Sequence, residues 1–325
     1  MRSDLESLID DAFRRRAPLV GSRVTNAWRV LNGSADAVEG LVVEKLGDVL
    51  VAQLHEGRLQ ISERDARWLV GQIHERLRTR AVYRKTFVRE RAHLPADLAQ
   101  AHADPKPWIG RPVEPEIPIE EHGLRFLIRP YDGFSVGLFL DQRDNRRRIR
   151  ELAAGRRVLN TFAYTCAFSV AAAAGQAAET ASVDLHKRYL EWGKRNFAAN
   201  ALDLATQRFF LSDTLEFYQR ARRQNRRYDL IILDPPTFSR TRRPARTFVL
   251  QEQLDALLTG AVQLLDPGGL LFLSTNDRGI SWLRLEQAVQ QAAGRRTCTI
   301  LERPALPLDF AGDPDYAKAL MVKYD

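Results

Sequence analysis

The sequence predicts an α/β protein in which a doubly wound parallel sheet follows a smaller N-terminal α/β domain. The first observation is a regular alternation of strand and helix patterns from Arg157 onward, which is typical of parallel sheets covered on both faces. The second is the continuous apolar run at 228–233, the pattern of a strand buried on both faces. The third is size, because 325 residues that are 45% hydrophobic suffice for two domains.

The first part of the chain is predicted to form the smaller domain. Residues 1–22 are expected to be a helical extension, and residues 23–130 a small α/β unit with a linker and a hairpin. In chain order we expect two strands, a helix, a short strand, a proline-rich linker and a hairpin at 40–45, 49–54, 63–77, 81–83, 95–118 and 117–128.

The larger domain is predicted to cover residues 131–325. Its strands are expected at 158–162, 181–184, 208–211, 228–233, 270–274, 298–301 and 319–322. Helices are expected at 168–174, 187–200 and 248–265. The helices connect successive strands, so the pattern specifies a sheet that is wound on both faces.

Composition excludes several classes of protein. No window is apolar enough to span a bilayer, and the acidic start of the chain is unlike a secretory signal. The two cysteines, Cys166 and Cys298, and six scattered histidines suggest neither a disulfide framework nor a metal site. We therefore expect a soluble, cytoplasmic protein without a metal.

The net charge of +8 comes from clustered arginines. Clusters lie at 14–16, 143–150, 220–227 and 240–246, and the last two flank the segment Asp234-Pro235-Pro236-Thr237-Phe238. Because arginine binds phosphate bidentately and stacks on bases, this pattern favours a nucleic-acid partner. Only seven of the 49 basic residues are lysine, so an arginine-rich genome is the competing explanation.

Acidic residues follow three successive strands of the predicted sheet. They are Asp184, Asp213 and Asp234. Ligands of open α/β sheets bind outside the carboxyl ends of the strands, where an acid can hold ribose hydroxyls or an adenine amino group. Each acid has a plainer role as a helix N-cap, and for Asp213 that role competes strongly.

The turn after the first of these strands restricts the cofactor. Residues 162–168 lack the G-x-G-x-x-G spacing that lets a backbone approach a pyrophosphate, which argues against NAD or FAD. A nucleoside without phosphates fits better, and S-adenosylmethionine also carries a sulfonium cation that suits a carboxylate-lined pocket. The stiff Asp-Pro-Pro turn and the aromatic Phe238 suggest a slot for a flipped base.

Three segments together resemble class I S-adenosylmethionine-dependent methyltransferases that modify bases of large-subunit ribosomal RNA. They are 137–143 (GLFLDQR), 159–165 (LNTFAYT) and 234–239 (DPPTFS). The EEHG hairpin at 120–123 and the segment 40–48 are similar to elements that precede the family's catalytic domain. The resemblance covers most of the chain after Arg23 and implies a Rossmann-like, seven-stranded methyltransferase sheet at 131–325.

The resemblance also implies roles for individual residues. Cofactor binding is expected of Asn160, Phe162, Tyr164, Thr165, Asp184 (ribose), Asp213 (adenine) and Asp234. Asp234, Pro235, Pro236 and Phe238 are expected to form the catalytic base pocket, and Arg143, Arg240, Asn276 and Arg278 to bind the RNA substrate.

This sequence departs from the family at two places. Residues before Arg23 are too few for the RNA-binding PUA domain that many members carry, so the small domain and the arginines are expected to select the target. Cys166 stands where relatives commonly have glycine, and it would be strained if that position requires a positive φ.

The residues favour guanine N7 over cytosine C5 as the methylated atom. Attack on cytosine requires a cysteine thiolate, which C5-specific relatives carry after the fifth strand, where this chain reads STNDRG at 274–279. That segment and DLHKRYLEW at 184–192 resemble the guanine-N7 branch. Two alternatives are a C5 enzyme that uses Cys298 or a displaced thiol and a non-catalytic RNA-binding assembly factor. A third is a small-molecule methyltransferase, which the basic surface disfavours.

Overall fold

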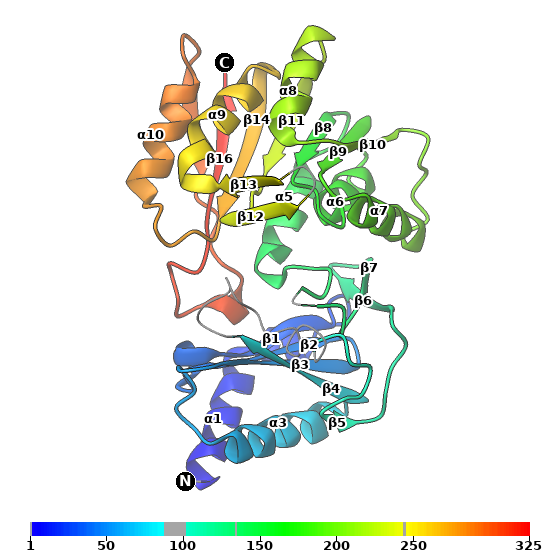
Figure 1. Ribbon diagram of the computed structural model, residues 1–325, viewed down its shortest axis with the longest axis vertical. Helices are drawn as coiled ribbons and strands as arrows, with labels where there is room; N and C mark the ends of the chain where they lie inside the picture. Colours follow the sequence, from blue (N-terminus) through cyan, green and yellow to red (C-terminus); the bar gives the residue numbers. More distant parts are fainter. Residues whose placement is uncertain (1, 88–101, 134, 243–244) are drawn as a thin grey trace. The chain divides into compact units, whose positions relative to one another are not determined.

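The computed structural model describes residues 2–87, 102–133, 135–242 and 245–325, which form two units (Figure 1). The small unit comprises Met1–Arg143 and Pro307–Asp313, and the large unit comprises Asp144–Leu306 and Pro314–Asp325. This division differs from the predicted boundary after residue 130. Residues 95–101 of the predicted linker and Arg243 of the last arginine cluster lie outside the described residues.

The small unit contains a five-stranded sheet in the order β1-β2-β3-β4-β5. The strands are β1 (Ala27–Asn32), β2 (Leu41–Leu46), β3 (Val49–His55), β4 (Ala81–Phe87) and β5 (Ile109–Gly110). Helix α3 (Glu63–Leu77) connects β3 to its parallel neighbour β4, and the other pairs are antiparallel. The Ser62 side chain caps α3 by accepting from the Asp65 amide at 3.1 Å.

The first residues are part of this unit's core rather than an extension. In α1 (Arg2–Arg15), Leu5, Ile9 and Phe13 are buried with Trp28 of β1. Their helical spacing places them on one stripe, which explains why the helix packs against the sheet. Further elements of this unit are α2 (Ala17–Val20), η1 (Gly33–Asp36), η3 (Leu140–Gln142) and the hairpin of β6 (Ile117–Glu121) and β7 (Leu124–Ile128).

A late segment of the chain completes the small unit. Asp309, in η4 (Leu308–Phe310), is buried and accepts two hydrogen bonds from the Arg143 guanidinium, at 2.5 and 3.1 Å. Its carboxylate also accepts from the Arg29 amide at 2.7 Å, while the Arg29 guanidinium lies 4.1 Å from the centre of the Phe310 ring. The side chain of Arg143 is 2% exposed, because this buried ion pair holds it.

The large unit contains a seven-stranded sheet in the order β10-β9-β8-β11-β14-β16-β15. The strands are β8 (Arg157–Thr161), β9 (Glu179–Asp184), β10 (Gln207–Leu211), β11 (Tyr228–Leu233), β14 (Leu265–Thr275), β15 (Cys298–Glu302) and β16 (Lys318–Tyr324). In this described sheet β16 is antiparallel to both of its neighbours, β14 and β15, and all other neighbouring strands are parallel. The predicted seven-stranded Rossmann-like sheet is thus confirmed, with its last strand reversed.

Helices cover both faces of this sheet (Figure 1). They are α5 (Arg143–Leu152), α6 (Ala167–Ala174) and α7 (Lys187–Ala199) near one face, and α8 (Thr214–Arg223), α9 (Leu250–Val262) and α10 (Trp282–Ala292) on the other. Side chains of β11 alternate between the two cores: Ile232 packs with α5 and α6, whereas Ile231 packs with α8 and α9. The alternation explains why this run is apolar throughout.

The chain order creates a switch point between β8 and β11. From β8 the chain passes outward to β9 and β10 and then returns to β11 on the other side of β8. A crevice at the carboxyl ends is expected at such a point. None of the helices in the described part of the chain is long and apolar enough to span a membrane.

Candidate active site

Two of the three predicted acids lie in one row across the carboxyl edge of the large sheet. Val183, Thr161 and Leu233 pair in register across β9, β8 and β11, and Asp184 and Asp234 are the next residues on the two outer strands. Two strand spacings separate them, which is about 9–10 Å along the sheet. Asp213 follows β10, one strand further out. The strand ends therefore bring the acids to the same edge, on both sides of the switch point.

The turn between β8 and α6 has an unusual backbone. Phe162, Tyr164 and Cys166 have φ values of 54°, 49° and 60°, although none of them is glycine. Non-glycine residues rarely occupy this left-handed region, and such strain concentrates at functional sites. The Ala163 amide donates to the Val183 carbonyl at 2.9 Å, which fixes the turn against β9.

Asp184 holds this turn in place. One carboxylate oxygen accepts from the Tyr164 amide and the other from the His186 amide, both at 2.8 Å. Partial burial raises the pKa of Asp184, and the two backbone donors oppose that rise. Each oxygen keeps a lone pair for a further donor, so the carboxylate can accept from ribose hydroxyls while it supports the turn.

Aromatic side chains lie beside Asp184. The Tyr164 ring meets the Tyr189 ring edge-to-face with centroids 4.5 Å apart, and the Trp192 ring is 6.4 Å away. Phe162 lies on the other side of the turn, where its ring packs 5.4 Å from Phe248. Acids, aromatic rings and a turn without a glycine-rich phosphate loop fit a nucleoside such as the predicted cofactor.

Cys166 has the strained conformation that the sequence predicted, and Gly193 of α7 accommodates it. A Cβ atom at residue 193 would lie 2.8 Å from the Cys166 Cβ and closer still to its Sγ. The absence of a side chain at residue 193 therefore provides the space that the cysteine fills. Complete burial raises the pKa of the Cys166 thiol to about 12, so the thiol stays protonated and is no nucleophile.

We expect Gly193→Ala to lower the free energy of unfolding by about 1–3 kcal/mol, because the new methyl group overlaps Cys166. In a Cys166→Gly background the same change should cost at least 1 kcal/mol less, since the overlapping atoms are gone. Urea denaturation of the wild type, the two single variants and the double variant measures this coupling.

Gly71→Ala is the matched control, because residue 71 also lies inside a helix, but a Cβ atom there would meet nothing closer than 3.9 Å. That change should stabilise the protein by roughly 0.5–1 kcal/mol, and additive effects at residues 166 and 193 would contradict the packing explanation.

Asp213 is the N-cap of α8. Its Oδ1 accepts from the Leu215 and Glu216 amides at 2.9 and 3.1 Å. Its Oδ2 accepts no hydrogen bond from the residues that the structure describes. The capping role that competed with adenine binding is therefore present, and one oxygen is left for the predicted contact.

Asp234 is partly buried at the end of β11. Its Oδ1 accepts a hydrogen bond from the Ser274 hydroxyl, which lies near the end of the adjacent strand β14. Burial raises the pKa of Asp234, while the Ser274 hydrogen bond and the positive charge of Arg146 oppose the rise. The sequence analysis missed both Ser274 and Arg146 as parts of this site. Only the position of Ser274 near a strand end, and of Arg146 within an arginine cluster, hinted at them.

The segment after Asp234 presents its side chains to solvent from Pro236 to Phe238. Pro235 is buried and Pro236 exposed, and their carbonyls accept no hydrogen bond from the described residues. Phe238 is 55% exposed, so it is not a core aromatic and its ring is accessible from solvent. The Thr237 hydroxyl donates to the Asn276 Oδ1 at 2.9 Å, which ties this turn to the end of β14.

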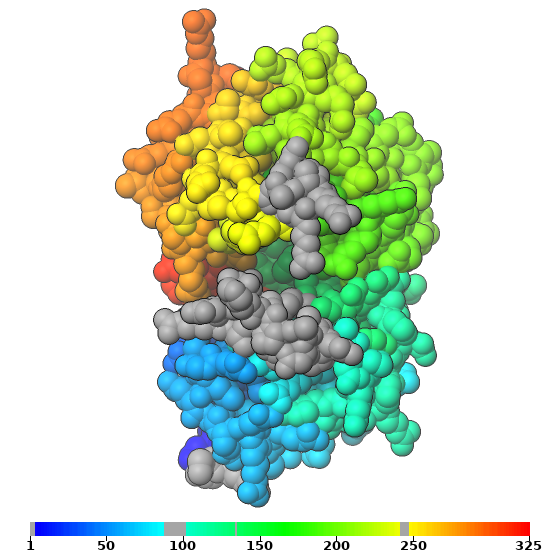
Figure 2. Space-filling model, in the orientation of Figure 1, coloured from blue at the N-terminus to red at the C-terminus, as the bar shows by residue number. Residues whose placement is uncertain are grey.

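The predicted substrate arginines have different environments. Arg240 is exposed on β12 (Phe238–Arg242), which pairs with β13 (Ala245–Val249) in a hairpin that the sequence analysis missed. The hairpin lies at the surface of the large unit in Figure 2, where it is yellow. Arg278 is exposed beside Asn276. Arg143 must be corrected: its guanidinium is buried in the ion pair with Asp309, so it is not available to a substrate.

Two predicted cofactor residues are buried and hydrogen-bonded inside the protein. Asn160 is 2% exposed and its Nδ2 donates to Ser169 Oγ at 2.9 Å. Thr165 is 1% exposed, and its carbonyl accepts from Asn196 Nδ2 at 2.9 Å. Both residues therefore shape the strained turn from within, and a direct cofactor contact by their side chains stays a prediction.

Comparison with known proteins agrees with this geometry. A family model described as S-adenosylmethionine-dependent methyltransferase matches residues 75–323. The chain is 33% identical to a ribosomal RNA large subunit methyltransferase of Deinococcus radiodurans, over 98% of this chain and 78% of the relative. It is 41% identical to ribosomal RNA large subunit methyltransferase K of Neisseria meningitidis serogroup B, over 49% of this chain and 45% of the relative. The crystal structure of SMU.776 complexed with SAH (S-adenosylhomocysteine) superposes with a TM-score of 0.87 at 27% identity, covering 99% of this chain and 81% of that one. The chain belongs to the family of S-adenosylmethionine-dependent methyltransferases.

Proposed function

We propose that this methyltransferase modifies large-subunit ribosomal RNA and that its target atom is N7 of a guanine. The observation that carries the proposal is the turn at the end of β11, where Asp234, the stiff Pro235–Pro236 pair and the exposed Phe238 follow one another. The relatives named above, which are large-subunit rRNA methyltransferases, support the substrate class.

Each element of the turn has a role in holding a guanine. Asp234 accepts from the N1 and N2 donors of the base, and Ser274 fixes the carboxylate that does so. Phe238 offers its exposed ring for stacking, a contact worth about 1–3 kcal/mol per base. The bond from Thr237 to Asn276 keeps the turn in register with β14. Exposed Arg240 and Arg278 then neutralise nearby phosphates.

Guanine N7 requires little chemistry from the protein. S-adenosylmethionine supplies an electrophilic methyl group, and N7 already has a lone pair and no proton to remove. Asp184 and the strained turn orient the nucleoside part of the cofactor, while Asp234 orients the base. Positioning of this kind lowers a barrier by about 7–11 kcal/mol. The protein therefore acts by alignment rather than by a covalent intermediate.

The positions and the raised pKa values of the two thiols favour guanine over cytosine as the methylated base. Cys166 is buried in the turn after β8, and its raised pKa keeps it protonated. Cys298 is the first residue of β15, two strands away from β14 and three from β11, and its pKa is also raised by burial. Residues 274–279, which include the end of the fifth strand β14 and the turn after it, contain no cysteine.

We expect purified enzyme to transfer methyl groups to large-subunit rRNA and to produce N7-methylguanine at a discrete position. Reaction with isotopically labelled S-adenosylmethionine, followed by mass spectrometry of nucleosides, identifies the product. Cys166→Ala and Cys298→Ala together should retain methyl transfer within about threefold, since neither thiol is needed. If the wild type instead forms 5-methylcytosine and the double variant does not, the covalent C5 mechanism would be established.

A further inference from the structure

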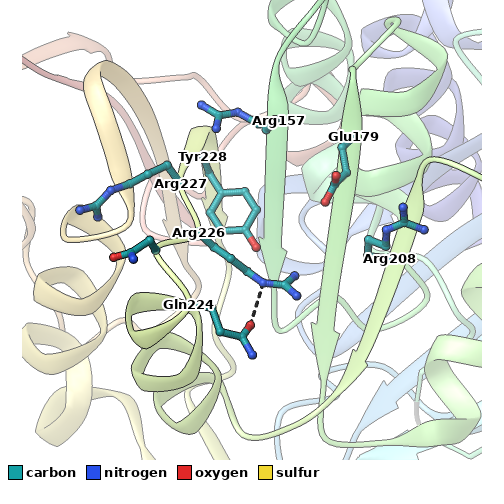
Figure 3. Close-up of a pocket in the computed structure, with 8 residues that line it drawn as sticks. Arg157, Glu179, Arg208, Gln224, Arg226, Arg227 and Tyr228 are labelled. Carbon is teal, nitrogen blue, oxygen red and sulfur yellow. Dashed lines mark hydrogen bonds between the residues drawn. The ribbon is translucent and has the colours of Figure 1, made fainter.

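A second polar groove lies at the opposite, amino-terminal edge of the large sheet (Figure 3). It has a volume of about 390 Å³ and is formed by the first residues of several strands and by the connection from α8 to β11. The lining residues are Arg157, Glu179, Arg208, Gln224, Asn225, Arg226, Arg227 and Tyr228. None of them belongs to the active site at the carboxyl edge.

Three of its four arginines lack a carboxylate partner among the described residues. Arg157 is paired with Asp229 and Asp266, so its charge is balanced. By contrast, Arg208 donates to the Ala205 carbonyl at 3.1 Å, and Arg227 donates to the Gln263 carbonyl.

Arg226 is half-buried, with its guanidinium 5.1 Å from the centre of the Phe210 ring. Its Nε donates to Gln224 Oε1 at 2.9 Å, which orients the guanidinium. The groove thus presents three arginines that are not ion-paired within the described part of the chain against a single carboxylate, Glu179, and this excess of positive charge favours an anionic ligand.

Tyr228 adds a buried hydroxyl whose hydrogen-bonding capacity is incompletely used. Its side chain is 3% exposed, and the hydroxyl makes no hydrogen bond of full geometry with the described residues, although the nearby Arg226 guanidinium opposes the rise that burial causes in its pKa. In Figure 3 the hydroxyl points toward the side of the groove where the Arg226 guanidinium lies, while Arg157 and Arg227 extend away from it. Burying an unpaired hydroxyl costs free energy, so a ligand that accepts from it would recover that cost.

The groove also contains an acceptor. Glu179, the first residue of β9, is half-buried and has no ion-pair partner among the described residues. Figure 3 shows its carboxylate across the groove from Arg226. Arginines and a hydroxyl suit a phosphate, whereas a carboxylate suits a ribose 2′-hydroxyl, and one nucleotide contains both groups. The volume lies within the range of sites that hold one small ligand.

We propose that this groove binds a nucleotide of the RNA substrate, with its phosphate at Arg208, Arg226 and Tyr228 and its ribose at Glu179. The proposal rests on the proposed function, because it makes the groove a second contact for the same RNA. Tyr228 begins β11 and Asp234 follows its end, so the two sites lie about 20 Å apart along the strand. The RNA therefore contacts both edges of the large sheet.

The test measures RNA affinity and methyl transfer with three variants of the full chain. Tyr228→Phe removes only the hydroxyl and should raise the Kd for rRNA about tenfold at low salt. Arg208→Gln combined with Arg226→Gln should raise the Kd further and reduce the slope of log Kd against log salt by about 0.7–0.9 per lost phosphate contact. The value of kcat at saturating RNA and the Kd for SAH should stay unchanged, because the active site is at the other edge.

Arg223→Gln is the matched control, since Arg223 is exposed on α8 next to the groove but does not line it. It removes the same charge and should leave the Kd within twofold of the wild type. Equal effects per removed charge of Arg223→Gln and of the double variant would reduce the groove to general surface charge and overturn the proposal. So would unchanged RNA affinity in Tyr228→Phe and the double variant.

Titration with inorganic phosphate and with adenosine monophosphate separates RNA from a small ligand. Binding only at millimolar concentration agrees with one nucleotide of a longer polymer. Micromolar binding of the mononucleotide, lost in the double variant while RNA affinity persists, would make the groove a small-molecule site and overturn the proposal. Absence of rRNA methylation by the wild type would count against the proposed function itself, whereas normal methylation with unchanged KM in the variants counts only against the groove.

Discussion

Replacing Asp234 by asparagine is expected to reduce kcat for rRNA methylation by about 10²–10³-fold, as removal of one preorganised group does in other active sites. Asparagine has nearly the same shape, but its amide group repels a base donor where the carboxylate accepted one. The bond to Ser274 Oγ places the carboxylate, so the loss should appear in kcat as well as in KM. Single-turnover methyl transfer at saturating RNA and cofactor measures it.

The same substitution should leave the fold intact. Burial raises the pKa of Asp234 in the folded protein above its unfolded value. Within the interval between those two values the folded state binds more protons, so this carboxyl makes stability fall as pH rises through it. At pH 7.5 Asp234→Asn should therefore unfold at the same or a higher urea concentration than the wild type. A variant that is both fully active and less stable would assign Asp234 to structure alone.

Replacing Asp184 by alanine is expected to raise the Kd for SAH about 100-fold. The carboxylate supports the strained turn through the Tyr164 and His186 amides and has lone pairs left for ribose. Its loss removes two acceptors from backbone donors, so the free energy of unfolding should also fall by about 1–3 kcal/mol. Isothermal titration calorimetry and urea denaturation measure the two effects.

Asp213→Asn serves as the comparison for Asp184. Asparagine also caps helices, so α8 should remain stable, and only the contact to adenine changes. We expect a Kd for SAH within about tenfold of the wild type. Equal losses for Asp213→Asn and Asp184→Ala would show that ribose binding is not the larger contribution.

The apolar patterns of the sequence predicted the strands of the large sheet, but they did not predict its most polar helix. The run at 228–233 became β11 with the predicted bounds because it is buried on both faces. Helix α5 reads RDNRRRIREL and contains only two apolar residues, so its pattern gave no signal. No strand was predicted for the hairpin β12–β13, and its last two residues were assigned to the helix predicted at 248–265, because Phe248 and Val249 continue the apolar spacing of α9.

The acids of the site were predictable, because residues that follow parallel strands lie at the carboxyl edge of the sheet. The residues that bond to these acids were not predictable. Ser274 and Asp234 are 40 residues apart in sequence, and they meet because β11 and β14 are neighbours in the sheet. The sequence does not show that these two strands are neighbours. Gly193 shows the same limit: its fit against Cys166 depends on how α7 packs against the turn. Arg143 was misassigned because charge alone cannot distinguish a buried ion pair from an RNA contact.

The pair of Arg143 and Asp309 also has a consequence for biosynthesis. The two residues are 166 positions apart, so at elongation rates of roughly 5–20 residues per second the ribosome adds the aspartate about 10–30 seconds after the arginine. During that interval the nascent N-terminal unit is incomplete, because the buried anion that anchors Arg143 and the Arg29 amide has not yet been made. The intervening chain meanwhile emerges with most of the larger sheet, so the first unit to be translated is among the last to be finished.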